Sequence, residues 1–122
     1  MEQKLYYNYK QFEKDMQIVA KKIKDNQVKY KNIFTVPRGG LIMAVRLSHL
    51  LNLPLILKKK YITQKTIIVD EIIDTGKTLH KYKNYFTVCL HYKPWANFKP
   101  SIFCHQTKKW VIYFWESKKI IK

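Results

Sequence analysis

The stretch that decides the fold is Ile67–Leu79, which reads IIVDEIIDTGKTL. Its first residues belong to an apolar run, Thr66–Val69, with the length and composition of a strand buried on both faces of a parallel sheet. Two acids, two apolar residues and the segment Asp74–Thr78 follow in that order. The pattern predicts a buried strand that ends in a polar, glycine-containing loop.

Glycines and acidic residues, which are scarce in this sequence, are concentrated in and beside this loop and one other, Pro37–Gly40. All three glycines of the chain lie in two short segments, Pro37–Gly40 and Asp74–Thr78, and three of its eight acidic residues, Asp70, Glu71 and Asp74, crowd into five positions. Adjacent carboxylates repel each other unless a cation or a hydroxyl ligand lies between them, so we interpret this cluster as a binding site. Each glycine loop taken alone is equally consistent with an ordinary turn.

Helical and strand-like patterns alternate on both sides of this stretch. Apolar residues at helical spacing, with lysines on the opposite face, predict a helix over about Tyr9–Lys24, and a mostly apolar segment predicts a second one over Leu41–Leu51. A third helix is expected to start within Thr78–Lys83. The expected strands are Asn32–Val36, Pro54–Leu57, Thr66–Val69, Tyr85–Tyr92 and Ser101–Cys104, and a last apolar, aromatic run is Trp110–Trp115.

The alternation of strands and helices predicts the fold class. It favours an α/β fold with a mainly parallel sheet, and without repeats or linkers we expect one domain over residues 1–122. Ligands of open α/β sheets bind beyond the carboxyl ends of the strands, where both glycine loops are expected. Glycine lets backbone N–H groups approach a phosphate, and a helix N-terminus after the loop adds a favourable dipole.

The overall composition excludes several classes of protein. With 122 residues, of which 47% are hydrophobic and 26% charged, the chain fits a globular domain rather than a disordered or fibrous protein. No apolar run approaches the roughly 18 residues needed to span a bilayer, and the first residues lack the apolar core of a signal peptide. The two cysteines, Cys89 and Cys104, are too few for a disulfide scaffold, so a cytoplasmic setting is expected.

The net charge of +16 predicts an attraction to anions. Nucleic acid, an anionic membrane surface and a phosphorylated small molecule are all compatible with it. All but two of the 24 basic residues are lysines, the exceptions being Arg38 and Arg46, and they are scattered along the chain. Specific phosphate and base readers favour arginine, so we expect at most weak, non-specific binding of nucleic acid.

A P-loop is the first rival for the segment that ends in Gly76-Lys77-Thr78. That motif needs a second glycine five residues before Gly76, because backbone N–H groups must cradle the phosphates. The residue at that position is Glu71, whose carboxylate would face the phosphates. The P-loop interpretation is therefore rejected.

Ile67–Leu79 instead resembles the phosphoribosyl-pyrophosphate (PRPP) signature of type I phosphoribosyltransferases, in which a hydrophobic strand, two acids and two hydrophobics precede a phosphate loop. The resemblance implies that Asp70 and Glu71 hold the ribose hydroxyls and Mg²⁺, and that Thr75–Thr78 donate hydrogen bonds to the 5′-phosphate. Pro37–Leu41, which reads PRGGL, is similar to the family's pyrophosphate loop. The PRPP-binding residues implied are Arg38, Gly39, Asp70, Glu71, Asp74, Thr75, Gly76, Lys77 and Thr78.

Further matches resemble the 6-oxopurine branch of the family, and most closely bacterial xanthine-guanine phosphoribosyltransferase. An aspartate at the start of the phosphate loop is typical of this branch, which implies that Asp74 is the catalytic acid/base and contacts the base. Lys93-Pro94 is similar to the lysine that contacts the purine O6, and Trp110-Val111 with Glu116 is similar to the end of the family's chain. The base-binding residues implied are Asp74, Lys93, Trp110 and Val111, and the metal ligands are Glu71, Asp70 and Glu116.

The resemblance also implies the architecture and the partners. We expect a mainly parallel sheet flanked by helices, a small C-terminal hood over the base, Mg²⁺ as cofactor, PRPP and a purine base as substrates, and a homodimer or homotetramer. The family's long flexible lid before the PRPP signature corresponds here only to Lys58–Lys65. The lysines at Lys58–Lys60 either neutralise pyrophosphate in its place or form a solvated strand end.

Two alternatives stay open beside this interpretation, and two others are disfavoured. A catalytically weak regulator or RNA-binding protein with the same fold is consistent with the charge and the short lid. An enzyme for another base is separable only by assay. A zinc site of Cys89, His91, Cys104 and His105 is disfavoured, because no CxxC-type pair exists and buried cysteines with surface histidines explain these residues more simply. Trp95 and Phe98 could stack on single-stranded bases, but core or oligomer packing is the expectation.

Overall fold

Five parallel strands form the main sheet, in the order β3-β2-β4-β5-β6. The computed structural model describes residues 3–116. The strands are β2 (Asn32–Thr35), β3 (Leu55–Ile56), β4 (Thr66–Ile73), β5 (Phe86–Tyr92) and β6 (Ile102–Gln106). The central strand β4 begins where the sequence predicts but continues through both acids of the cluster, so that Asp70 and Glu71 are strand residues.

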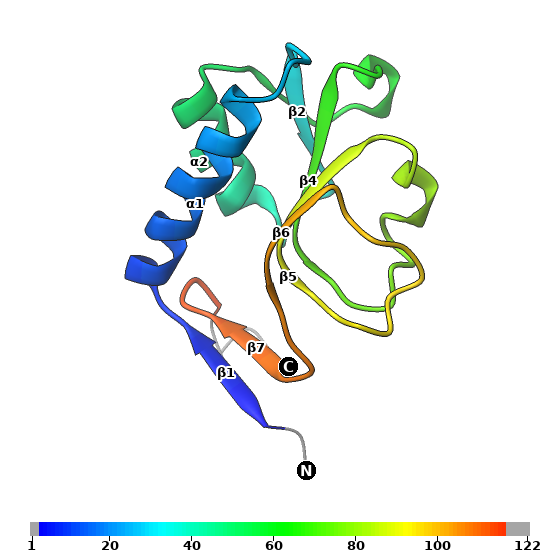
Figure 1. The fold of residues 1–122 in the computed structure, drawn as a ribbon. Coiled ribbons are helices and arrows are strands. Elements are labelled where there is room, and N and C mark those ends of the chain that lie inside the picture. The colour runs from blue at the N-terminus through cyan, green and yellow to red at the C-terminus, as the bar shows by residue number, and fades with distance from the viewer. Residues whose placement is uncertain (1–2, 117–122) are drawn as a thin grey trace.

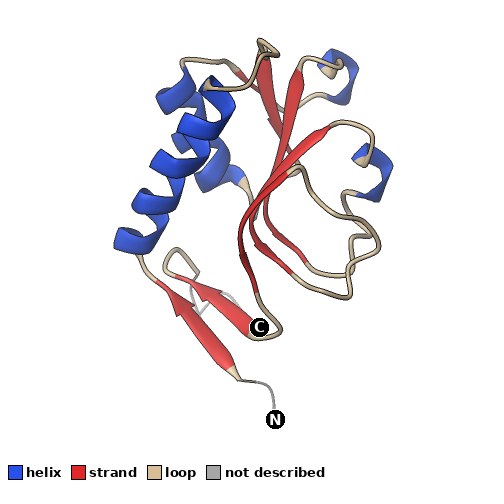
Figure 2. Cartoon of the chain, in the orientation of Figure 1, coloured by secondary structure: helices blue, strands red, loops and turns tan. Residues whose placement is uncertain are grey.

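Both α-helices lie on one face of this sheet (Figures 1 and 2). They are α1 (Tyr9–Lys24) and α2 (Leu41–Leu51), with the bounds that the apolar spacing predicts. A capping box at Asn8 and Gln11 satisfies the first N–H groups of α1. The two helices are joined by a bidentate ion pair between Arg46 and Glu13, with N···O distances of 2.8 and 2.6 Å. The main apolar core lies between these helices and the sheet.

The opposite face of the sheet is covered by loops and two 3₁₀ turns, η1 (Lys59–Tyr61) and η2 (His80–Tyr82). The expectation that an α-helix starts within Thr78–Lys83 is wrong. In the structure, which describes all of this segment, it contains only the short turn η2. Leu79 and Tyr82 from this turn are both buried in a second apolar cluster with residues of β2, β4 and β5. One turn of 3₁₀ geometry suffices to bury two residues three positions apart, since it has three residues per turn.

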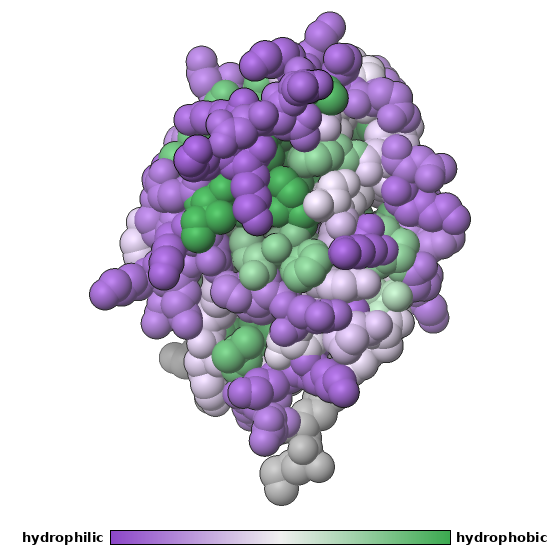
Figure 3. Space-filling view, viewed as in Figure 1, coloured by the Kyte–Doolittle hydropathy of each residue, from purple (hydrophilic) through white to green (hydrophobic). Residues whose placement is uncertain are grey.

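A separate two-stranded sheet stands beside the main one and is made from both ends of the chain. Strand β1 (Lys4–Tyr7) pairs in parallel with β7 (Trp110–Tyr113), so the hood predicted at the C-terminus also includes an N-terminal strand. Hydrophilic side chains cover most of the face shown in Figure 3, and apolar side chains gather near its centre. No helix within residues 3–116 is long and apolar enough to cross a membrane.

The strand order places the two glycine loops on either side of one crevice. After β2 the chain moves to β3 at one edge, and it then returns to build β4, β5 and β6 on the other side of β2. The loops that leave β2 and β4 therefore diverge from adjacent strands, which is the arrangement at which open α/β sheets bind ligands.

Candidate active site

The glycine loop that follows β2 packs directly against the two acids of β4. A Cβ atom on Gly39 would collide with the carboxylate of Glu71, and a Cβ atom on Gly40 would lie 2.5 Å from Oγ1 of Thr35 and 3.1 Å from Cα of Asp70. Side chains at these two positions would push the loop that follows β2 away from the acids of β4. Glycine is required here because of this close approach.

Arg38 lies in the turn between β2 and α2. Its side chain is exposed, and the Pro37–Arg38 peptide bond is cis. Its carbonyl accepts a hydrogen bond of 3.1 Å from the N–H of Leu41, the first residue of α2. The exposed Arg38 side chain is thus carried by the short turn that leads from β2 into α2.

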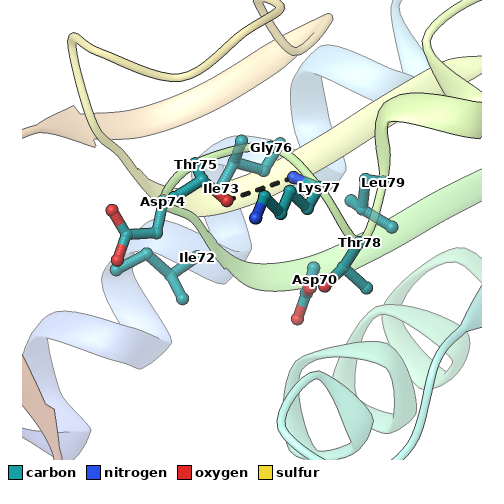
Figure 4. A pocket seen from close by; sticks show the side chains of 9 residues that line it. All are labelled: Asp70, Ile72, Ile73, Asp74, Thr75, Gly76, Lys77, Thr78 and Leu79. Atoms are coloured by element: carbon teal, nitrogen blue, oxygen red, sulfur yellow. Dashed lines mark hydrogen bonds between the residues drawn. The ribbon is translucent and has the colours of Figure 1, made fainter.

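The second loop encloses a cavity of about 180 Å³, lined by Asp70 and by residues 72–79 (Figure 4). Thr75, Lys77 and Thr78 are exposed there, and the N–H of Lys77 lies 3.3 Å from Oγ1 of Thr75. Gly76 has a φ of +91°, a conformation that favours glycine. The loop leads into η2 rather than an α-helix, so the expectation of a helix dipole beside this loop is wrong. The N–H and hydroxyl groups of the loop itself remain as hydrogen-bond donors.

Asp70 and Glu71 lie half-buried at the carboxyl half of β4. The N–H of Glu71 donates to Oδ1 of Asp70 at 2.9 Å. Burial, followed by the neighbouring Glu71 carboxylate, raises the pKa of Asp70 well above its usual range. Burial and the second carboxylate thus both disfavour the charged form of Asp70.

Glu116, the third expected metal ligand, is not brought to this pair. Its Oε1 instead accepts a hydrogen bond of 2.7 Å from the N–H of Tyr113 at the end of β7. Within the described part of the chain, no three His, Cys, Asp or Glu side chains converge into a metal-holding group. The structure thus places Glu116 at the end of β7 and apart from Asp70 and Glu71.

Side-chain contacts connect Asp74 and Lys93, two of the residues implied for base binding, with the segment that leads into β7. The indole Nε1 of Trp95 donates to Oδ1 of Asp74 at 2.8 Å. The Nζ of Lys93 lies 5.3 Å from the centre of the Trp95 ring and donates a hydrogen bond to the carbonyl of Lys109. Lys109 immediately precedes Trp110, so Asp74, Lys93 and β7 are gathered around one tryptophan.

Trp110 and Val111 open strand β7 with opposite exposures. Trp110 is 55% exposed and Val111 is 7% exposed, so the indole is available as a platform while the valine anchors the strand. The neighbouring Lys93 is buried, with 4% exposure, which fixes its ammonium group in place. Asp74 and Lys93 are thus linked through Trp95, and Lys93 reaches the residue that precedes Trp110.

Comparison with solved structures identifies the family. A purine phosphoribosyltransferase from Pyrococcus horikoshii is 31% identical, with 98% of this chain and 97% of that one aligned at a TM-score of 0.82. The chain belongs to the type I phosphoribosyltransferase family.

More distant phosphoribosyltransferases share the fold. The xanthine-guanine-hypoxanthine phosphoribosyltransferase of Helicobacter pylori is 21% identical, over 98% of this chain and 97% of that one, at a TM-score of 0.81. The hypoxanthine phosphoribosyltransferase of Trypanosoma cruzi is 19% identical over 80% of this chain and 72% of that one, at a TM-score of 0.63. No protein-family model and no curated protein matches the sequence.

Several residues of this phosphoribosyltransferase site escaped the sequence analysis. Trp95, expected to pack in the core or at an oligomer contact, is 53% exposed and bound to Asp74. Asn97 packs against Gly76 and donates its N–H to the carbonyl of Thr75 at 3.0 Å. Both follow strand β5, and a position beyond the carboxyl end of a parallel strand is the general signal by which they could have been found. His91, expected at the surface, is buried with 1% exposure.

Proposed function

We propose that this protein is a purine-salvage phosphoribosyltransferase that transfers the ribose 5-phosphate of PRPP to a 6-oxopurine, namely guanine, xanthine or hypoxanthine. The observation that carries the proposal is the linked pair of Asp74 and Lys93, which Trp95 joins beside the phosphate loop. A carboxylate and an ammonium group presented together suit the N–H donor and the carbonyl acceptor of a 6-oxopurine. Family membership supports the reaction type.

PRPP fits the crevice between the two glycine loops. The N–H and hydroxyl groups of Thr75–Thr78 would receive the 5′-phosphate in the cavity of about 180 Å³. Arg38, exposed on the facing loop, would meet the pyrophosphate. The carboxylates of Asp70 and Glu71 lie between these two positions and would accept hydrogen bonds from the ribose hydroxyls.

The acids also fit Mg²⁺, which the family implies. Mg²⁺ is usually held by one or two carboxylates together with substrate phosphates, so the pair Asp70 and Glu71 is sufficient without Glu116. The raised pKa of Asp70 shows that burial beside a second carboxylate disfavours its charged form, and a cation would relieve that. When bound there, the ion would offset the charge that develops on the departing pyrophosphate.

The residues of the proposed site account for each bond and proton that changes in the transfer. The N9 lone pair of the purine attacks C1′ of the ribose, the C1′–O bond to pyrophosphate breaks, and its electron pair leaves on pyrophosphate. The proton on N7 passes to the carboxylate of Asp74, whose second oxygen is held by Trp95. Lys93 donates to the O6 of the base, and Trp110 stacks on its face.

A panel of bases tests the proposal. The protein is incubated with PRPP, Mg²⁺ and either guanine, xanthine, hypoxanthine, adenine, uracil or orotate, and pyrophosphate release and nucleotide formation are measured, with base-free and PRPP-free reactions as controls. We expect nucleoside 5′-monophosphate only from the 6-oxopurines. Turnover confined to adenine, uracil or orotate would overturn the specificity, and no turnover on any base would overturn the enzyme assignment.

A further inference from the structure

A hydrogen-bonded chain connects the hood to the backbone of the acid pair. The hydroxyl of Tyr113, in β7, donates to the carbonyl of Glu71 at 3.0 Å, and Nδ1 of His91, in β5, lies 2.9 Å from the same hydroxyl. Tyr113 is 4% and His91 1% exposed, so neither contact competes with bulk water. The chain thus crosses from the base-binding strand to the PRPP-binding strand through the protein interior.

The donor and the acceptor in each of these two hydrogen bonds follow from the carbonyl at which the series ends. A carbonyl cannot donate, so the single proton of the Tyr113 hydroxyl points to Glu71, and the hydroxyl oxygen accepts from Nδ1–H of His91. Burial, then the nearby His105, lowers the pKa of His91 to about 4, so its imidazole is neutral and has one N–H. Its Nε2 is then a bare acceptor, and that atom is indeed buried without a hydrogen-bond partner among the described residues.

The Tyr113 hydroxyl acts on a residue in the middle of the sheet. In the pairing of β4 with β5, Glu71 lies between Asp70, which is opposite Cys89, and Ile72, which is opposite His91. The Tyr113 hydroxyl is a side-chain hold on the peptide of Glu71, whose carboxylate rests against Gly39 in the opposite loop. Rotation of that peptide would turn the Glu71 carboxylate away from the crevice.

We propose that Tyr113 is a positioning residue that couples the base site to the PRPP site, with His91 fixing the direction of its hydroxyl. Strand β7 carries Trp110 and Val111 at one end and Tyr113 at the other, so a base that orders the strand also holds the Glu71 peptide in its PRPP-binding orientation. Coupling of this kind is reciprocal, so PRPP also strengthens binding of the base. The inference rests on the proposed function of the two sites.

Tyr82 supplies a matched control. It is also buried, at 6% exposure, but its hydroxyl has no hydrogen-bond partner among the described residues. Tyr113→Phe and Tyr82→Phe therefore remove the same atom from similar surroundings, and only the first breaks the chain. A general loss of packing would affect both variants alike.

The experiment is a grid of initial rates over guanine and PRPP concentrations with Mg²⁺, below the melting temperature of each variant. In the wild type we expect the KM for PRPP to fall as guanine rises. In Tyr113→Phe this dependence should vanish and the KM for PRPP at saturating guanine should rise about three- to tenfold, the value of one neutral hydrogen bond, while Tyr82→Phe matches the wild type. His91→Asn, which keeps an N–H donor, should retain more coupling than His91→Leu.

The outcomes separate this inference from the proposed function. Wild-type turnover with identical grids for Tyr113→Phe and Tyr82→Phe would overturn the positioning role alone. If the wild type turns over no base, the proposed function fails, and calorimetry of PRPP binding then decides: a three- to tenfold loss of affinity in Tyr113→Phe sustains the link to Glu71, and unchanged affinity or no binding in the wild type overturns it.

Discussion

The two sides of the proposed active site, one for PRPP and one for the base, are constructed in different ways. The PRPP side comes largely from one continuous segment, Asp70–Thr78, backed by the glycines of the adjacent loop. The base side is assembled from Asp74, Lys93 to Trp95, and the start of β7, and it depends on the hydrogen bonds of two side chains. The first is fixed by strand pairing and glycine packing, whereas the second can be altered by a single side-chain substitution.

The largest effect should come from the acid pair on the PRPP side. In Asp70→Asn with Glu71→Gln the shapes are kept and the charges removed, so PRPP affinity should fall at least about 100-fold, since hydrogen bonds to charged groups are each worth about 1.5–3 kcal/mol. Calorimetry in the presence of Mg²⁺ measures this loss. The melting temperature should not fall, because the repulsion between the carboxylates is also removed. Unchanged PRPP affinity would contradict the assignment of the PRPP side.

Asp74, which belongs to both sides of the site, should show the next largest effect. Asp74→Asn should lower kcat by roughly 10²–10⁴, the usual contribution of a positioned acid/base group. PRPP affinity should fall far less, because the phosphate is held by the loop that follows Asp74. Steady-state rates together with PRPP calorimetry separate the two effects. A variant that turns over like the wild type would remove the proton-transfer role.

A substitution confined to the base side sharpens the comparison. Trp95→Phe deletes the 2.8 Å hydrogen bond to Asp74, so kcat/KM for guanine should fall about tenfold, as expected for a lost bond to a charged group. PRPP affinity should stay within about twofold of the wild type. Trp95→His, which keeps a ring N–H, is the conservative variant and should recover part of the loss. Equal losses in PRPP and guanine binding would mean that the two sides are not separable.

The smallest effect concerns the surface charge of +16. Steering of anionic PRPP by lysines predicts that kcat/KM for PRPP falls a few-fold as salt rises to physiological strength, whereas kcat is unchanged. RNA binding should be weak and should disappear over the same range, since each neutralised phosphate releases a counterion. RNA binding that is sequence-selective at physiological salt, without turnover on any base, would favour the nucleic-acid alternative.

The same contrast determines what the sequence could predict. Helices α1 and α2 follow from local apolar patterns, and both predictions are confirmed. The helix expected within Thr78–Lys83 is wrong, because Leu79 and Tyr82 are spaced for a 3₁₀ turn as well as for an α-helix.

The errors on the base side have a different origin. The sequence predicts a surface position for His91 as the simple alternative to a zinc site, and this is wrong. Its partner Tyr113 is 22 residues away in the sequence, and no local pattern indicates that the two side chains meet in the interior. Trp95 likewise carries no local sign that its indole turns toward Asp74, 21 residues earlier. Tertiary hydrogen bonds between distant residues are invisible to periodicity and to motif spacing.

The hood also sets the order in which the molecule can assemble. Lys4 pairs with Trp110, near opposite ends of the chain, so β1 must wait for almost the whole polypeptide before it finds its partner. The strands and loops of the PRPP side are complete earlier and close over shorter stretches of chain, which costs less entropy. Pairing of β1 with β7 therefore closes the longest loop of the fold, so we expect the hood to form after the shorter loops of the PRPP side.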